Sequence, residues 1–135
     1  MFFCRDKEIS LTLQKICLWL YSIIVKYMKQ INYNTVVEEI RRVATSIKPQ
    51  NSKVVLFGSR ARGDSIPASD WDLLVLVDKP HLSADDYDKY SYPFWELGWK
   101  LDEMIHPIVF TVNDWKNKSN FIFKHNIEKE GIVLC

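Results

Sequence analysis

The sequence predicts a domain of the α/β (α+β) class, with a small mixed β-sheet backed by helices. Short runs of valine, leucine and isoleucine alternate with longer segments in which apolar residues recur at helical spacing. The chain has 135 residues, of which 47% are hydrophobic and 13% are aromatic. This length and composition suit one hydrophobic core and exclude a disordered chain.

A strongly apolar segment lies in the N-terminal region, where ICLWLYSIIV covers Ile16–Val25. A membrane-spanning helix needs about twenty such residues, so we expect no membrane association. Asp6 and Glu8 stand where a signal peptide carries positive charge. We therefore expect a helix over Leu11–Gln30.

This helix is expected to form an N-terminal helical extension, residues 1–30, followed by a separate domain at residues 31–135. Its apolar side chains suit packing, or the formation of an oligomer through the helix. An alternative interpretation is that Met28 is the natural start of the protein.

A second helix is expected to begin at Asn34, because an asparagine side-chain oxygen is a good acceptor at a helix N-cap. Apolar residues then recur at helical spacing from Val36 to Ile47. Pro49 should end this helix, because a proline disfavours helical backbone in the residue before it.

Two strands are expected next, on either side of a loop. Lys53–Phe57 is short and rich in β-branched residues. Trp71–Val77 is a nearly continuous apolar run, which is typical of a strand covered on both faces. The segment between them, Gly58–Ser69, holds two glycines and a proline and is predicted to be a loop.

The following segment should contain a helix and an edge strand. Ser83 opens the sequence SADD, which is typical of an N-cap with acidic residues in the first turn. The helix is expected to run to about Asp102, with Pro93 interrupting or restarting it. Met104–Val112 is predicted to be a third strand, and Pro107 within it indicates an edge strand or a bulge.

The C-terminal segment is predicted to form one more helix and a short final piece. Asn113 or Asp114 is expected to cap the helix. The residues GIVL, which begin at Gly131, are expected to form the final piece.

Charge and cysteine content limit the functional classes. The formal net charge is +1, so the basic excess typical of strong nucleic-acid binding is missing. The cysteines, Cys4, Cys17 and Cys135, are odd in number and far apart, so we expect no disulfide and a cytoplasmic location.

Two aspartates precede and enter the second strand. Residues two apart on a strand point to the same face, so Asp70 and Asp72 should project together, roughly 6–7 Å apart at Cα. Two negative charges at that distance repel by on the order of 2.5 kcal/mol at an effective dielectric constant of 20. Solvent, an arginine or a divalent cation would relieve the repulsion. Magnesium suits this pair, because it prefers one or two carboxylates together with waters and substrate phosphates.

A glycine–serine pair ends the first strand. Gly58 has no Cβ, so a phosphate group could approach its backbone closely. Ser59 offers a hydroxyl group and is expected to begin a short helical turn, whose free N–H groups attract anions. A phosphate there, opposite paired carboxylates, suits phosphoryl or nucleotidyl transfer.

With these residues in place, the segment LFGSRARGDSIPASDWDLLVLVD resembles the minimal nucleotidyltransferase (MNT) family of the DNA polymerase β-like superfamily. The shared pattern is Gly58-Ser59, ten further residues, and Asp70-Trp71-Asp72 followed by apolar residues. The arginine-rich form GSRARG is the usual version in that family. The resemblance implies a nucleotidyltransferase (polymerase β palm-like) fold for the domain.

The resemblance also implies a reaction and its site residues. Asp70 and Asp72 would be catalytic and would bind Mg²⁺, while Gly58 and Ser59 would hold the phosphates of a nucleotide, with ATP as the expected substrate. An acceptor hydroxyl would attack the α-phosphate, and pyrophosphate would leave. Arg62 is a further candidate for phosphate contact. The alternative for Arg62, and also for Arg60, is a surface network that neutralises nearby aspartates.

One departure from the family pattern concerns the third carboxylate, which the family carries on a neighbouring strand. His106 in MIHPIVFT falls near that position. A neutral histidine could act as a base, since its ordinary pKa is near 6.5, but magnesium prefers oxygen ligands. Asp102 or Glu103 could substitute for the carboxylate, and a purely structural histidine is the remaining alternative.

The resemblance implies a HEPN-type helical toxin as partner, with this chain as the antitoxin that transfers AMP from ATP to the toxin. The alternative is a catalytically weak nucleotidyltransferase-like module that acts by binding a protein. A nucleotidyltransferase for small molecules, a third class, would need an additional acceptor-binding domain.

Overall fold

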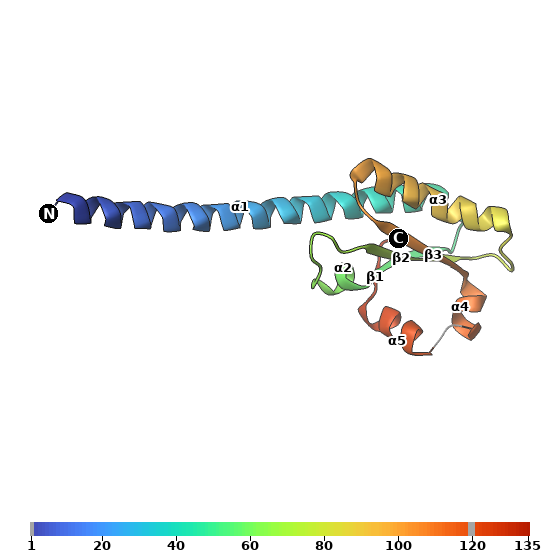
Figure 1. Cartoon of the computed structure of the whole chain (residues 1–135). Coiled ribbons are helices and arrows are strands. Elements are labelled where there is room, and N and C mark those ends of the chain that lie inside the picture. The colour runs from blue at the N-terminus through green and yellow to red at the C-terminus, as the bar shows by residue number, and fades with distance from the viewer. Residues whose placement is uncertain (1, 119–120) are drawn as a thin grey trace. The chain divides into compact units, whose positions relative to one another are not determined.

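The computed structural model describes the backbone of residues 2–118 and 121–135. By its internal contacts, the chain divides into two compact units, Met1–Val36 and Val37–Cys135. The second unit is a four-stranded mixed sheet with helices on both faces, which confirms the predicted fold class (Figure 1). Among the described residues, none of the helices is long and apolar enough to cross a membrane.

The first helix differs from the expectation. A single helix, α1, runs from Phe2 to Ile47, so the prediction of a separate helix beginning at Asn34 was wrong. A good N-cap residue does not break a helix when the residues on both sides of it are good helix formers. In the second unit, α1 contributes the fully buried Ile40 and Ala44, and Arg41 Nε donates a hydrogen bond of 2.9 Å to the carbonyl oxygen of Leu134.

The sheet has the strand order β3-β2-β1-β4. Strands β1 (Lys53–Phe57) and β2 (Trp71–Val77) have the predicted bounds and pair antiparallel. Strand β3 (Ile105–Thr111) pairs parallel with β2 and lies at an edge, as Pro107 predicted. The short β4 (Ile132–Val133) pairs antiparallel with β1 at the other edge.

Apolar side chains cover both faces of the sheet. On one face, the alternate β2 residues Trp71, Leu73, Val75 and Val77 are all fully buried. Helix α3 (Ala84–Leu101) covers this face, to which it contributes the buried Tyr90, Phe94 and Leu97 (Figure 1). On the opposite face, α4 (Val112–Lys118) and α5 (Phe121–Glu130) complete a cluster of four buried residues: Val55, Leu74, Trp115 and Ile127.

Local signals explain where these helices begin. Ser83 caps α3 as predicted, because its side chain accepts from Asp86 N–H while the Asp86 carboxylate accepts from Ser83 N–H. Pro93 lies inside α3 without ending it, which corrects the expected interruption. Neither Asn113 nor Asp114 caps α4, because that helix begins at Val112 and the Thr111 hydroxyl accepts the Asp114 N–H at 2.9 Å.

Candidate active site

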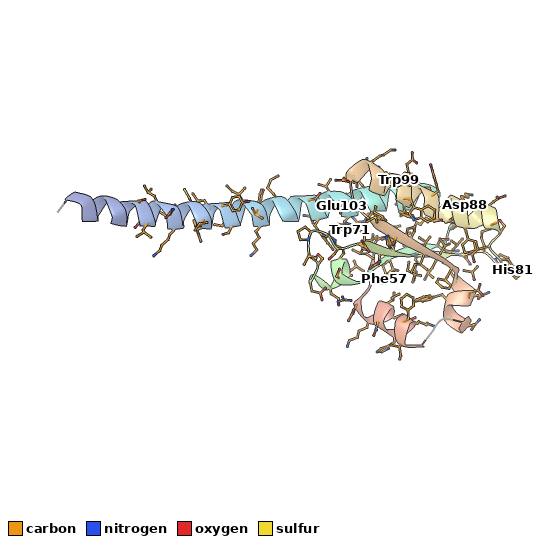
Figure 2. The ribbon with its side chains drawn as sticks, in the orientation of Figure 1. Phe57, Trp71, His81, Asp88, Trp99 and Glu103 are labelled. Carbon is orange, nitrogen blue, oxygen red and sulfur yellow. The ribbon has the colours of Figure 1, made fainter. Side chains whose placement is uncertain are left out.

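Asp72 lies in the middle of a row of three residues that crosses the sheet. The register pairs Asp72 with Phe57 on β1 and with His106 on β3. Residues paired in register project to the same face of a sheet, so these three side chains share one face. It is the face that packs against α4 and α5, and Phe57 lies on that side in Figure 2. Trp71, one residue earlier, points to the opposite face.

Several predicted site residues lie close enough to Asp72 to change its pKa. Burial raises the pKa of Asp72 above its ordinary value of 3.8, and the negative charge of Asp70 raises it further. His106 and Arg62 act in the opposite direction and lower the pKa of Asp72. Asp70 and Asp72 are both half-buried, whereas His106 is exposed. The two carboxylates therefore repel each other at a surface that a cation or a substrate can reach.

Gly58 is in direct contact with this carboxylate. Its backbone has φ 74° and ψ −157°, a combination that is almost restricted to glycine. A Cβ atom placed on Gly58 would lie 2.6 Å from Oδ2 of Asp72, much closer than carbon and oxygen approach. Glycine is therefore required both by the backbone conformation and by the neighbouring carboxylate.

Ser59 begins the short helix α2 (Ser59–Arg62), as the sequence predicted. The backbone N–H groups of Ala61 and Arg62 both donate to the carbonyl oxygen of Gly58 at 3.0 Å, and Gly63 closes the turn in the left-handed conformation. The serine is half-buried. The glycine–serine corner therefore adjoins the Asp72 carboxylate. Gly58 lies against the carboxylate, and Ser59, which carries the hydroxyl group, is the next residue.

Arg62 lies on the exposed side of α2. Its guanidinium group forms ion pairs with Asp64 at 3.2 Å and with Glu130 of α5 at 3.3 Å. The hydrogen bond to Asp64 is the main reason that the pKa of Arg62 lies above its ordinary value. Part of the surface-network interpretation is therefore correct for Arg62, although its charge also acts on Asp72.

A recess of about 210 Å³ adjoins the glycine–serine corner, and Gly58, Arg62, Phe123, Asn126 and Glu130 are among its lining residues. A larger recess, of about 480 Å³, lies further along the same face, over Leu74 and Leu76. The smaller recess is the relevant one for the site, because it alone of the two is lined by Gly58 and Arg62.

Arg60 does not belong to a surface network, so that alternative was wrong for this residue. It is buried, and its guanidinium group lies 4.6 Å from the centre of a Trp71 ring. It forms an ion pair with Glu103 at 3.8 Å, and Glu103 also accepts a hydrogen bond of 3.1 Å from Trp71 Nε1. Figure 2 shows Trp71 and Glu103 close together on the side of the sheet opposite Phe57. The two arginines could have been distinguished from the sequence, because residues two apart on a helix lie about 200° apart around its axis.

The suggestion that Glu103 or Asp102 replaces the third carboxylate receives no support. Glu103 interacts with Arg60 and Trp71 on the opposite face from Asp72. Asp102 is the exposed C-cap of α3, in the left-handed conformation. Among the side chains that the structure describes, no group of three or more histidine, cysteine, aspartate or glutamate residues is arranged to hold a metal ion. His106 is thus the ionisable residue that the β3 register places beside Asp72.

The arrangement is suited to chemistry on a phosphate group. Two half-buried carboxylates stand near a glycine that has no side chain of its own, an exposed histidine lies beside one of them, and an arginine adds positive charge. The carboxylates would repel a free anion, so a phosphate group could approach them only with its charge compensated.

Comparison with known sequences points in the same direction. A family model described as "Nucleotidyltransferase domain" matches residues 37–132. A protein from Methanocaldococcus jannaschii, named "Putative protein adenylyltransferase MJ0604", is 31% identical over 97 residues, which are 72% of this chain and 91% of that protein. "Putative protein adenylyltransferase MJ0141" from the same organism is 29% identical over 100 residues, 73% of this chain and 95% of that protein.

Solved structures show the same fold. A toxin–antitoxin crystal structure with AMP-PNP superposes with a TM-score of 0.56 and 18% identity, over 73% of this chain and 72% of that chain. A mutant of the toxin–antitoxin complex MntA–HpeT superposes with a TM-score of 0.53 and 15% identity, over 73% of this chain and 71% of that chain.

Proposed function

The chain belongs to the minimal nucleotidyltransferase family and is a nucleotidyltransferase, and we propose that it transfers AMP from ATP to an acceptor hydroxyl group in a magnesium-dependent reaction. The observation that carries the proposal is the contact between Gly58 and the Asp72 carboxylate, with the charge of Asp70 close by. The absence of a side chain on Gly58 allows the Asp72 carboxylate to lie against the glycine, and the two carboxylates would supply oxygen ligands for the cation that accompanies a triphosphate.

Asp70 and Asp72 would hold Mg²⁺, and the fit can be judged from their electrostatics. Their mutual repulsion and the burial of Asp72 raise the pKa of Asp72, and a bound cation would relieve both effects. Two carboxylates are a usual protein contribution to a magnesium site, because waters and phosphate oxygens complete its octahedron. When bound, the ion would neutralise charge on the phosphates.

Gly58, Ser59 and Arg62 would bind the phosphates of the nucleotide. The glycine corner allows a phosphate group to approach the backbone, and the half-buried serine supplies a hydroxyl donor. Arg62 already lies within electrostatic range of Asp72, so its guanidinium group could pair with a phosphate near that carboxylate. The guanidinium group would then exchange Asp64 or Glu130 for the nucleotide.

His106 would act as the general base. Its position beside Asp72 and its exposure suit a group that meets an incoming acceptor. The neutral imidazole would take the proton of the acceptor hydroxyl as that oxygen bonds to the α-phosphorus. The bond from the α-phosphorus to the bridging oxygen would break, and pyrophosphate would leave.

The proposed acceptor is a hydroxyl group on a HEPN-type toxin, with this chain as its antitoxin. Two observations support the proposal: the relatives in Methanocaldococcus jannaschii carry the name of protein adenylyltransferases, and toxin–antitoxin complexes share the fold. The unit Val37–Cys135 consists of one small sheet with its helices, so a protein acceptor would bring its own recognition surface.

A second candidate function is a weak nucleotidyltransferase that neutralises its partner by binding alone. One observation favours this second candidate. Among the described residues, no third acidic or histidine side chain joins two others in an arrangement that could hold a metal ion. The two candidates differ in whether the partner carries covalent AMP after incubation.

The deciding experiment combines α-labelled ATP, Mg²⁺ and a candidate HEPN-type toxin as the acceptor. Adenylyl transfer predicts label on the toxin, and Asp72→Asn should abolish it. Asp78→Asn, on the exposed residue just after β2, is the matched control and should keep the label. A toxin that is bound and neutralised without label would contradict the transfer proposal and support the second candidate.

A further inference from the structure

We infer that Arg60 is a positioning residue that holds Asp70 beside Asp72, an inference that rests on the proposed function of these two carboxylates. The eight residues from Gly63 to Asp70 connect α2 to β2 without a helix or strand. Asp70 stands at the end of this connection and outside the β2 ladder, so its placement depends on what fixes the connection.

Arg60 binds the backbone immediately before Asp70. Its Nε and Nη2 atoms donate to the carbonyl oxygen of Ser69 at 3.2 and 2.9 Å, and Nη2 also donates to the carbonyl oxygen of Pro67 at 3.2 Å. The Ser69 carbonyl belongs to the peptide group whose nitrogen is that of Asp70. These bonds therefore fix the orientation of the peptide plane from which Asp70 starts.

The loop itself is folded against this arginine. The Ser69 N–H donates to the carbonyl oxygen of Ile66 at 2.9 Å, and the Ser69 hydroxyl accepts from the Ile66 N–H at 2.9 Å. Ile66–Ser69 is therefore a closed turn, and Arg60 holds two of its four carbonyl groups. Because the turn is closed by its own hydrogen bonds, the position of the Arg60 guanidinium group determines where Asp70 begins.

The guanidinium group is itself fixed from two further directions. The Trp71 ring lies 4.6 Å away, and Glu103, two residues before β3, forms the 3.8 Å ion pair. Glu103 also accepts from Trp71 Nε1 at 3.1 Å, and Trp71 N–H donates to the carbonyl oxygen of Met104 at 2.8 Å. Arg60, Trp71 and Glu103 are 6%, 0% and 13% exposed, so little water competes for these bonds.

This cluster explains why GSRARG carries two arginines. Arg62 lies on the exposed side of α2 and pairs with Glu130 of α5. Arg60 lies on the buried side of the same helix, where it binds Glu103 and the carbonyl oxygen of Ser69. Trp71 lies between the two aspartates in sequence but projects into the cluster. Arg60 does not touch the substrate in this assignment. It acts through the backbone of Ser69 and the ring of Trp71.

Arg60→Lys tests the assignment, because lysine keeps the charge but replaces the fork of N–H groups with one ammonium group. We expect the affinity for Mn²⁺ with AMP-PNP, measured by calorimetry, to fall at least about tenfold while the thermal transition remains cooperative. Hydrogen exchange of the amides of residues 64–70 should accelerate, and exchange in β1 and β2 should not change. The matched control is Arg42→Lys, on an exposed arginine of α1 in the same unit.

Wild-type affinity and wild-type exchange in a folded Arg60→Lys variant would overturn the inference and leave the proposed function intact. If the wild-type protein binds no Mn²⁺ with AMP-PNP, both the proposed function and the inference fail. If Arg60→Lys does not fold, Glu103→Gln serves in its place, since glutamine keeps the acceptor for Trp71 Nε1 and removes the charge that faces Arg60. Unchanged affinity and unchanged exchange in the Glu103→Gln protein would overturn the inference.

Discussion

A Cβ atom on Gly58 would lie 2.6 Å from Oδ2 of Asp72, so a glycine at the end of β1 shapes the space beside a carboxylate of β2. The atom in the way is the end of a side chain that can rotate. A larger residue at this position would therefore displace the Asp72 carboxylate, in addition to straining the backbone at Gly58.

Gly58→Ala should reduce transfer activity by about 10²-fold, because a shift of about 1 Å in a reacting geometry has an effect of that size. The backbone conformation at φ 74° should also destabilise the variant by roughly 1–3 kcal/mol. The measurements are adenylyl transfer and thermal unfolding. Gly63→Ala is the control, because φ is 84° there but a Cβ atom would meet nothing within 4 Å. Equal losses of activity in both variants would show that backbone strain, and not the Asp72 contact, is responsible.

Asp72→Asn should raise the stability of the protein without metal or nucleotide, while it lowers transfer by at least about 10²-fold. The pKa of Asp72 is raised in the folded state, so ionisation of this carboxyl opposes folding above its ordinary value of 3.8. The gain should appear as a Tm above that of the wild-type protein at neutral pH. The Tm difference from wild type at neutral pH should disappear below pH 3.8. A lower Tm for Asp72→Asn would contradict the assigned repulsion.

His106→Ala should lower transfer by about 10²–10⁴-fold if the imidazole is the general base. His106→Asp would restore a carboxylate in the row with Asp72, and we expect it to bind Mn²⁺ more tightly than the wild-type protein does. Adenylyl transfer by His106→Ala and by the wild-type protein, measured side by side, checks the assignment. Unchanged transfer in a folded His106→Ala variant would exclude His106 as the base.

The Lys79–Asp86 ion pair, at 2.8 Å, should make stability depend on pH in the acidic range. The hydrogen bond from Lys79 is the main cause that lowers the pKa of Asp86 below 3.8. The pair therefore contributes fully above pH 3.8 and is lost as the pH falls through the lower pKa of the folded state. Asp86→Asn keeps an acceptor for the Ser83 N–H and removes the ion pair, so its Tm should fall less than that of wild type on acidification.

Asp85→Asn is the control for the ion-pair prediction, because Asp85 lies in the same first turn of α3 and the variant leaves Lys79 and Asp86 in place. Its Tm should follow the wild-type pH dependence. If Asp85→Asn flattens the dependence as much as Asp86→Asn does, the effect belongs to the helix terminus and not to the ion pair.

Removal of residues 1–30 should leave a domain, residues 31–135, that unfolds cooperatively and transfers AMP. The truncated chain keeps the whole unit Val37–Cys135 and the family match at 37–132. The removed part carries exposed apolar side chains, among them Leu18 and Trp19 at 69% and 63% exposure. We therefore expect any oligomer of the full chain to be lost, which light scattering over a concentration series would measure. An unchanged oligomer would place its interface in the domain.

Much of the fold follows from local patterns in the sequence. The bounds of β1 and β2, the Ser83 cap and the edge position of β3 were all predicted from residues close together in the chain. The predictions that failed were also local. Asn34 and Asp114 resemble N-caps, but α1 continues through Asn34, and the Thr111 hydroxyl takes the role expected for Asp114. Local capping preferences are worth about 1 kcal/mol, and the rest of the structure can outweigh them.

By itself, the sequence was enough to predict the residues that are proposed to carry the chemistry. Gly58, Ser59, Asp70 and Asp72 are separated by short distances along the chain, and strand alternation predicted that the two aspartates would project together, although β2 begins only at Trp71. Only the tertiary structure decided which residues meet them. The parallel pairing of β3 places His106 beside Asp72, and the buried Arg60 binds Glu103, forty-three residues later in the chain. Contacts of that kind depend on strand register and on burial, which are properties of the whole packed sheet. They produce no periodic pattern of residues in the sequence from which they could be predicted.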